Sequence, residues 1–180
     1  MHMLYVTTCQ CGGNEMDNQT HKYENHSHQN KAFTPHNKDP YQIREKLSEP
    51  SHCSDCGAVY DKGHWIWGKP TIDSTPHRCP ACSRIKDKVP AGFLTLKGPF
   101  LTDHKQEILH LVKNLEEREK LSHPLERIMT IEDAHPELII CFTGMHLAKA
   151  TGDAIHHAYQ GSLDIQFVER DSQIRIEWER

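Results

Sequence analysis

Two pairs of cysteines carry the clearest chemistry in this sequence. Cys53 and Cys56 belong to the string CSDC, and Cys79 and Cys82 belong to the string CPAC that follows after a spacer. Each CxxC pair can fold as a knuckle that directs both sulfurs to one centre, and four thiolates form the tetrahedral shell that structural Zn²⁺ prefers. The spacing therefore predicts one structural zinc ion bound by all four cysteines.

Other uses of paired thiols fit the sequence less well. A thioredoxin-like redox pair requires a βαβ setting, which the sequence around the cysteines does not show. The N-terminal residues lack the basic start and apolar stretch of a secretory signal, and no apolar run approaches the ~20 residues of a membrane span. These features predict a soluble cytoplasmic protein, where reducing conditions disfavour structural disulfides and favour metal binding.

The segment that contains the cysteines is basic. Residues 60–97 contain seven Lys or Arg against three Asp, a net charge of +4, whereas residues 98–180 contain nine against fifteen, a net charge of −6. Contact with a polyanion such as RNA is thus expected at the cysteine module, with cations near phosphates and aromatic rings stacked on bases. The alternative for the aromatic residues is packing against the module or bridging to the next domain. The candidate RNA-binding residues are Lys62, His64, Trp65, Trp67, Lys69, Arg84 and Lys86.

The sequence divides into three segments. Residues 1–38 are rich in His and Asn, lack periodicity and are expected to form a disordered tail, in which Cys9 and Cys11 are a weak metal signal. Residues 39–100 are expected to form a zinc-ribbon module of short strands and turns, punctuated by Gly and Pro. Residues 101–180 show the alternating helical and strand periodicities of an α+β domain.

The expected order of elements in the third segment is helix, strand, strand, repeated once. Apolar residues at helical spacing predict a helix that begins at Thr102 or Asp103 and ends before Pro124. Together, the predicted helices and strands are expected to form an αββ-αββ domain with a four-stranded antiparallel sheet covered by two helices on one face. Glu126 and Arg127 are expected to form a surface ion pair. The other predicted elements are strands at 125–132 and 138–143, a helix at 145–159, and strands at 163–167 and 174–178.

Several strings in order resemble a family of small bacterial zinc-ribbon proteins. They are DPYQIREKLSEPSHCSDCGAVYDKGHWIWG, RCPACSRIKDKVPAGFLTLKGPFL, EEREKLSHPLERIM, HLAKATGDAIHHAYQGSL and the closing WER, and together they extend over residues 39–180. That family is in turn similar to the N-terminal part of the archaeal and eukaryotic export adaptor of the large ribosomal subunit. The adaptor carries more CxxC pairs than this chain, so the resemblance implies contact with the ribosome or its RNA and not export. The residues that match its pattern are Cys53, Cys56, Gly63, Trp65, Cys79 and Cys82.

These observations predict a non-enzymatic zinc-ribbon protein that binds structured RNA, most readily as a ribosome-associated factor, and a role in stress is an extension of this prediction. The sequence has no phosphate-binding glycine loop, nucleophile elbow or zinc-protease motif, which favours the non-enzymatic interpretation. The alternative is a protein–protein adaptor or regulator in which the ribbon is only a scaffold and a protein partner binds elsewhere. The removal of basic ribbon residues would separate the two hypotheses.

Overall fold

The computed structural model describes residues 39–41, 47–168 and 172–180. The predicted tail at 1–38, with Cys9 and Cys11, lies outside these residues. The described part contains helices and two mixed sheets and is α+β, as the sequence predicted. None of its helices has both the length and the apolar character needed to cross a membrane.

The first sheet and the helix that follows it form a unit that we call the ribbon, residues 51–87. Its strand order is β3-β2-β1-β4, with β1 antiparallel to β2 and parallel to β4. Lys62 and Gly63 both have positive φ and form the tight turn between β2 and β3. The helix was not predicted, because only short strands and turns were expected here. The elements are β1 (Ser51–His52), β2 (Val59–Asp61), β3 (His64–Ile66), β4 (Thr75–Pro76) and α1 (Pro80–Asp87).

The rest of the described chain forms a second unit that we call the sheet domain, residues 91–180. Its five strands lie in the order β6-β7-β5-β9-β8. The predicted order of helix, strand, strand, repeated once, is present, and one further strand precedes it. The elements are β5 (Gly92–Lys97), α2 (Pro99–Ser122), β6 (Ile128–Ala134), β7 (Glu137–Phe142), α3 (Met145–Tyr159), β8 (Ser162–Val168) and β9 (Gln173–Glu179).

The prediction of a four-stranded antiparallel sheet is wrong because β5 is the central strand. β5 pairs antiparallel with β7 and parallel with β9, so the sheet is mixed. Residues 92–97 fall within the segment predicted to be a zinc-ribbon module of short strands and turns, so the sequence does not predict a central strand of the following domain there. Leu94 and Leu96 are nevertheless fully buried, and this burial at the middle of the sheet stabilises the strand.

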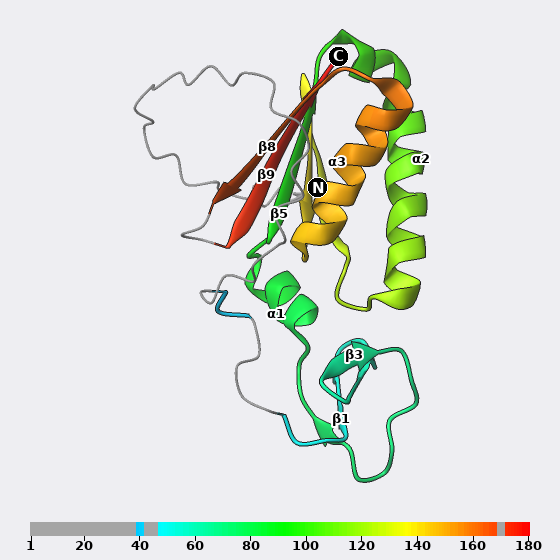
Figure 1. The fold of residues 1–180 in the computed structure, drawn as a ribbon, viewed down its shortest axis with the longest axis vertical. Helices are drawn as coiled ribbons and strands as arrows, with labels where there is room; N and C mark the ends of the chain where they lie inside the picture. The colour runs from blue at the N-terminus through cyan, green and yellow to red at the C-terminus, as the bar shows by residue number, and fades with distance from the viewer. Residues whose placement is uncertain (1–38, 42–46, 169–171) are drawn as a thin grey trace, which may run out of the picture. The chain divides into compact units, whose positions relative to one another are not determined.

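Both long helices lie on the same face of this sheet (Figure 1), and the core lies between the two layers. Leu94, Ile140 and Ile176 contribute to the core from adjacent strands, while Ile108 and Ile155 contribute from α2 and α3. A Cβ at Gly92 would lie 2.5 Å from the Cβ of Ala148, so the glycine permits close contact between β5 and α3. The helix predicted at 145–159 is confirmed, and α2 begins three residues before Thr102 because Pro99 occupies its first turn.

Candidate metal centre

The four predicted ligands come together at one end of the ribbon. The Sγ atoms of Cys53, Cys56, Cys79 and Cys82 all lie within 4.8 Å of one another, and those of Cys56 and Cys79 are 3.8 Å apart. Tetrahedral zinc with Zn–S bonds of ~2.3 Å places its sulfurs about 3.8 Å apart. The cluster could therefore hold a metal ion, and both its donor atoms and its spacing fit zinc.

A tight turn after β1 shapes the first cysteine pair. The N–H of Gly57 donates to the carbonyl of Cys53 at 2.9 Å, and the N–H of Cys53 donates to the carbonyl of Ala58 at 2.7 Å. Gly57 has a φ of 78°, which side-chain-bearing residues rarely adopt. These bonds reverse the chain within the CSDCG string and direct both thiols toward the same point.

The second cysteine pair lies at the start of α1. Cys79 is the N-cap residue, and its sulfur accepts from the backbone N–H of Cys82 at 3.5 Å. Pro80 occupies the first turn, where a residue without an N–H is favoured. The positive end of the helix dipole therefore faces the sulfurs and favours their thiolate form.

Three thiols of the cluster differ in how readily they ionise in the metal-free protein. Burial raises the pKa of Cys79, and burial likewise raises the pKa of Cys82 to about 11. Burial alone would raise the pKa of Cys53 as well. Backbone N–H groups that donate to its sulfur, chiefly the N–H of Cys79, outweigh the effect of burial and lower the pKa of Cys53 to about 7. A metal ion must therefore displace protons from the buried members of the cluster when it binds.

One side chain of the sheet domain reaches the cluster. The guanidinium of Arg127 donates from Nη2 to Cys56 Sγ at 3.1 Å and from Nη1 to Cys82 Sγ at 3.4 Å. Its Nε donates to the carbonyl of Pro124 at 2.6 Å, and the residue is only 8% exposed. Four thiolates with one Zn²⁺ carry a net charge of −2, so a buried cation is the expected counter-charge.

Thr143 fixes the backbone around Arg127. Its Oγ1 accepts from the N–H of Arg127 at 2.9 Å and donates to the carbonyl of Leu125 at 2.6 Å. The predicted surface ion pair of Glu126 with Arg127 is therefore wrong, because the guanidinium turns inward to the sulfurs. Spacing gave no signal for this contact, since Arg127 lies far along the chain from all four cysteines.

Trp67 makes a second contact between the two units. Its Nε1 donates to the carbonyl of Lys120 at 2.6 Å, near the end of α2, where helical carbonyls lack partners within the helix. The guanidinium of Arg127 lies 5.7 Å from the centre of the Trp67 ring. Trp67 is still 39% exposed, so it bridges the units and also presents part of its side chain to solvent.

Comparison with known proteins gives no family for this chain. No family model, curated protein or solved structure matches it. The assignment of a metal centre therefore rests on the geometry of the four cysteines and on the arginine that contacts them.

The structure separates the seven candidate RNA-binding residues into two groups. Trp65 and Arg84 are 8% and 4% exposed. Arg84 forms an ion pair with Asp39 at 2.6 Å, donates to the carbonyl of Val89 at 3.1 Å and stacks on Tyr41, so its charge is already neutralised. The remaining five candidates project into solvent from the ribbon: Lys62, His64, Trp67, Lys69 and Lys86.

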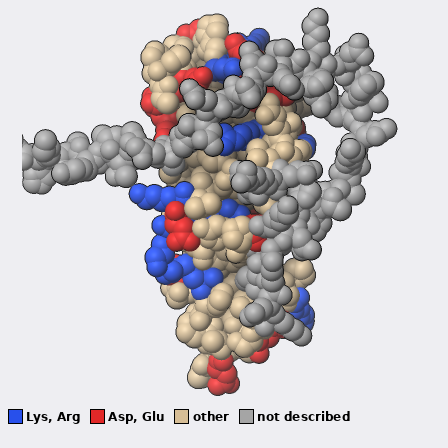
Figure 2. Space-filling model, turned by 90° about the vertical axis from the view of Figure 1, so that its left-hand side faces the viewer, with Lys and Arg blue, Asp and Glu red and all other residues tan. Residues whose placement is uncertain are grey.

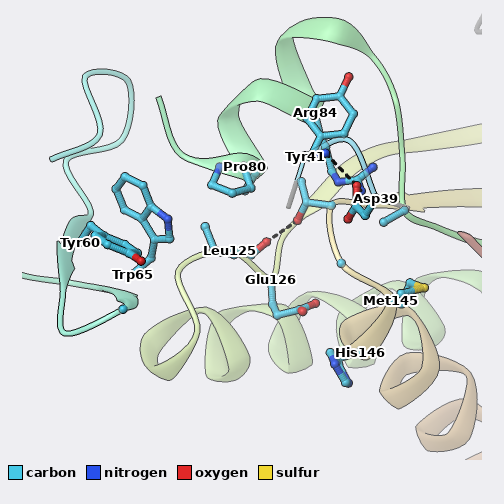
Figure 3. A pocket seen from close by; sticks show the side chains of 15 residues that line it. Asp39, Tyr41, Tyr60, Trp65, Pro80, Arg84, Leu125, Glu126, Met145 and His146 are labelled. Carbon is cyan, nitrogen blue, oxygen red and sulfur yellow. Dashed lines mark hydrogen bonds and ion pairs between the residues drawn. The ribbon is translucent and has the colours of Figure 1, made fainter. Parts of the chain in front are cut away.

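A cavity of about 310 Å³ lies beside the cluster, between the ribbon and the first turn of α3 (Figure 3). Glu126 lines this cavity and caps the helix, because its Oε2 accepts from the N–H of Leu147 at 2.9 Å. The helix has Gly144 as its N-cap residue and no side-chain cap of its own. Glu126 thus performs the capping role from a neighbouring loop.

Burial raises the pKa of Glu126 above its ordinary value of 4.5, against the lowering effect of the Leu147 N–H. The folded state therefore holds this proton more tightly than the unfolded state. The stability that the protonated form contributes is complete below the ordinary pKa and is lost as the pH rises through the folded-state pKa.

Glu126→Gln should consequently gain stability relative to the wild type as the pH rises from about 4 to about 8. The glutamine oxygen still accepts from the Leu147 N–H but cannot ionise. Urea denaturation across this range measures the difference. Glu126→Ala, which removes the acceptor, should be less stable than the wild type at low pH as well. A difference between Glu126→Gln and the wild type that does not change with pH would contradict the assignment.

Proposed function

We propose that this protein is a non-enzymatic, zinc-stabilised RNA-binding protein that acts in the cytoplasm and contacts structured RNA, most readily on the ribosome. The observation that carries the proposal is the net charge of +4 on residues 60–97, a segment that contains the second cysteine pair of a cluster that could hold a metal ion. A closed shell of four thiolates leaves no open coordination position, which fits a structural role for the metal.

The exposed cations of the ribbon support contact with phosphates. Lys62, Lys69 and Lys86 project from the β2–β3 turn, the chain after β3, and α1. Lys and Arg side chains also gather on the face shown in Figure 2, at the height of α1 in Figure 1. Trp67, which is 39% exposed on the same ribbon, offers aromatic surface on which a base can stack.

A charge-removal variant tests the proposal. Lys62→Gln, Lys69→Gln and Lys86→Gln together should weaken binding to structured RNA and to ribosomes and should reduce the slope of log affinity against log salt by about 2 to 3. Each lost phosphate contact removes the counterion release that accompanied it. Co-sedimentation of zinc-loaded protein with ribosomes over a range of salt concentrations measures both effects.

A matched control removes the same charge from the helices of the sheet domain. Lys113, Arg118 and Lys149 are exposed on α2 and α3, and their triple replacement by Gln should change RNA binding much less. Equal losses in the two variants would show non-specific attraction by net charge. If the wild type stays in the supernatant even at low salt, the RNA-binding proposal fails.

A second candidate function, a protein–protein adaptor, is supported by an apolar hollow of about 470 Å³. Trp67 and Leu121 line it, with Glu117 and Lys120 beside them, and Leu121 is 77% exposed. Exposed apolar surface of this kind is typical of protein contacts. Leu121→Ser should leave RNA binding unchanged under the first function and should abolish partner binding under the second, as a pull-down would show.

A further inference from the structure

The cavity between the ribbon and α3 has the character of a small-molecule site. Its volume of about 310 Å³ is at the lower end of the ~300–1,000 Å³ range of ligand pockets. Tyr60 and Trp65 contribute aromatic walls from the ribbon, and Leu125 and Met145 contribute apolar walls from the sheet domain. This space is suited to one compact, largely apolar ring system.

One polar group in the wall lacks the partner that its burial requires. Trp65 is 8% exposed, and its Nε1–H has no hydrogen-bond acceptor within reach among the described residues. In the view of Figure 3, the indole nitrogen lies on the side of the ring that faces Pro80 and Leu125, two residues that also line the cavity. Buried donors without a partner are rare in native proteins, and a ligand is one of the groups that can satisfy them.

The other tryptophans of the chain show how unusual this is. Trp67 Nε1 donates to the carbonyl of Lys120 at 2.6 Å, and Trp178 Nε1 donates to the carbonyl of Gln160 at 2.7 Å. All three tryptophans lie within the described residues, and Trp65 alone among them leaves its indole N–H unused.

The opposite wall offers an acceptor. Glu126 accepts from the N–H of Leu147 with Oε2 when it caps α3, and the two oxygens of a carboxylate have the capacity to accept from a further donor. The nearby charges of Asp39 and Arg84 neutralise each other at 2.6 Å. This pair leaves Glu126 as the carboxyl group of the wall that can serve a ligand, so a ligand gains from an acceptor that faces Trp65 and from a donor that faces Glu126.

A neutral, planar ring with both a carbonyl acceptor and an N–H donor on its edge satisfies all of these conditions. We propose that this cavity binds a single unstacked nucleobase, with the base edge accepting from Trp65 Nε1–H and donating to Glu126. Protein sites that read unpaired bases combine aromatic walls with hydrogen bonds to the base edge in this way. The inference rests on the proposed RNA-binding function when the base belongs to RNA, and a free nucleoside offers the same chemistry.

The indole N–H resonances of the zinc-loaded full chain provide the test. The signal of Trp178 acts as an internal control, because its hydrogen bond is already formed and the residue is buried outside the cavity. We expect the Trp65 signal, and not that of Trp178, to move to the position of a hydrogen-bonded indole when uridine or guanosine is added at millimolar concentration, or when a single-stranded RNA is added. A shift with RNA only identifies the source as RNA, and a shift with nucleosides identifies the cavity as a free-base site.

The matched variants are Trp65→Phe and Trp178→Phe. Trp65→Phe keeps an aromatic ring and removes only an N–H that bonds to nothing in the free protein, so the fold should persist. We expect it to weaken binding of the base about tenfold, whereas Trp178→Phe, which removes an indole N–H outside the cavity, should leave nucleoside binding unchanged. A Trp65 signal that does not move with any of the probes, or equal affinity of Trp65→Phe and the wild type, would overturn the inference.

The outcomes also separate this inference from the RNA-binding proposal. If RNA binding depends on salt and is lost in the triple lysine variant, but the Trp65 signal does not move, the RNA-binding function is retained and the base site is rejected. A Trp65 shift with nucleosides, without any retention on RNA or ribosomes, would retain the base site and reject the function.

Discussion

Cys79→Ser should abolish stoichiometric zinc binding and unfold the ribbon while the sheet domain stays folded. Cys79 is both a ligand and the N-cap of α1, and its sulfur also accepts from the N–H of Cys82. Structural zinc contributes about 10–16 kcal/mol of apparent binding free energy in small zinc domains, which far exceeds what the small ribbon core can replace. The sheet domain has its own buried cluster of apolar residues and does not require the metal for its core.

Two measurements check this expectation. Metal analysis should give about one zinc per chain for the wild type and none for the variant. Amide resonances should collapse for residues 51–87 and remain dispersed for the core of the sheet domain. Cys141→Ala is the matched control, because Cys141 is a buried cysteine of β7 outside the cluster. It should reduce stability and keep the zinc, and loss of zinc from this control would contradict the assignment of ligands.

The sequence was sufficient to predict that the four cysteines lie together, because the signal of the CxxC pairs is local. CxxC spacing and the Gly after the first pair determine the knuckle, and the geometry around Gly57 is the one expected of a positive-φ turn. The helices of the sheet domain were also predictable, since their apolar residues recur at helical spacing. α3 is confirmed at both ends, and Gly161 follows its C-cap residue.

The errors come from non-local interactions. β5 has too short an apolar run to be recognised as a strand, and only its pairing with β7 and β9 makes it the centre of the sheet. Arg127 and Trp65 show the same limitation for side chains. Whether a residue at an unremarkable position is exposed or buried against a distant cluster depends on tertiary packing, which neither periodicity nor spacing encodes.

Arg127→Met should destabilise the zinc-loaded protein by about 3–5 kcal/mol, because it removes one partner of a buried charge pair and leaves the other uncompensated. It should also raise the rate at which a chelator removes zinc, with a loss of about 10–100-fold in metal affinity. Arg127→Lys should recover only part of the loss, since one ammonium cannot reproduce the fork that bonds two sulfurs and the carbonyl of Pro124.

The matched control for this prediction is Arg175→Met. Arg175 is an exposed residue of β9 that lies over the ring of Phe93, and its replacement should change stability by no more than about 0.5 kcal/mol. Thermal denaturation with and without zinc then isolates the coupling between Arg127 and the metal.

In the metal-free protein the buried thiols of Cys79 and Cys82 hold their protons, because burial raises their pKa. The guanidinium of Arg127 then has less negative charge to neutralise, so the cost of Arg127→Met should shrink when zinc is removed. Such a dependence would show that metal binding strengthens the contact between the ribbon and the sheet domain, whose shared cavity contains Trp65 and Glu126. An equal cost with and without zinc would mean that Arg127 acts only through its bond to Pro124 and through packing, and that the two units dock independently of the metal.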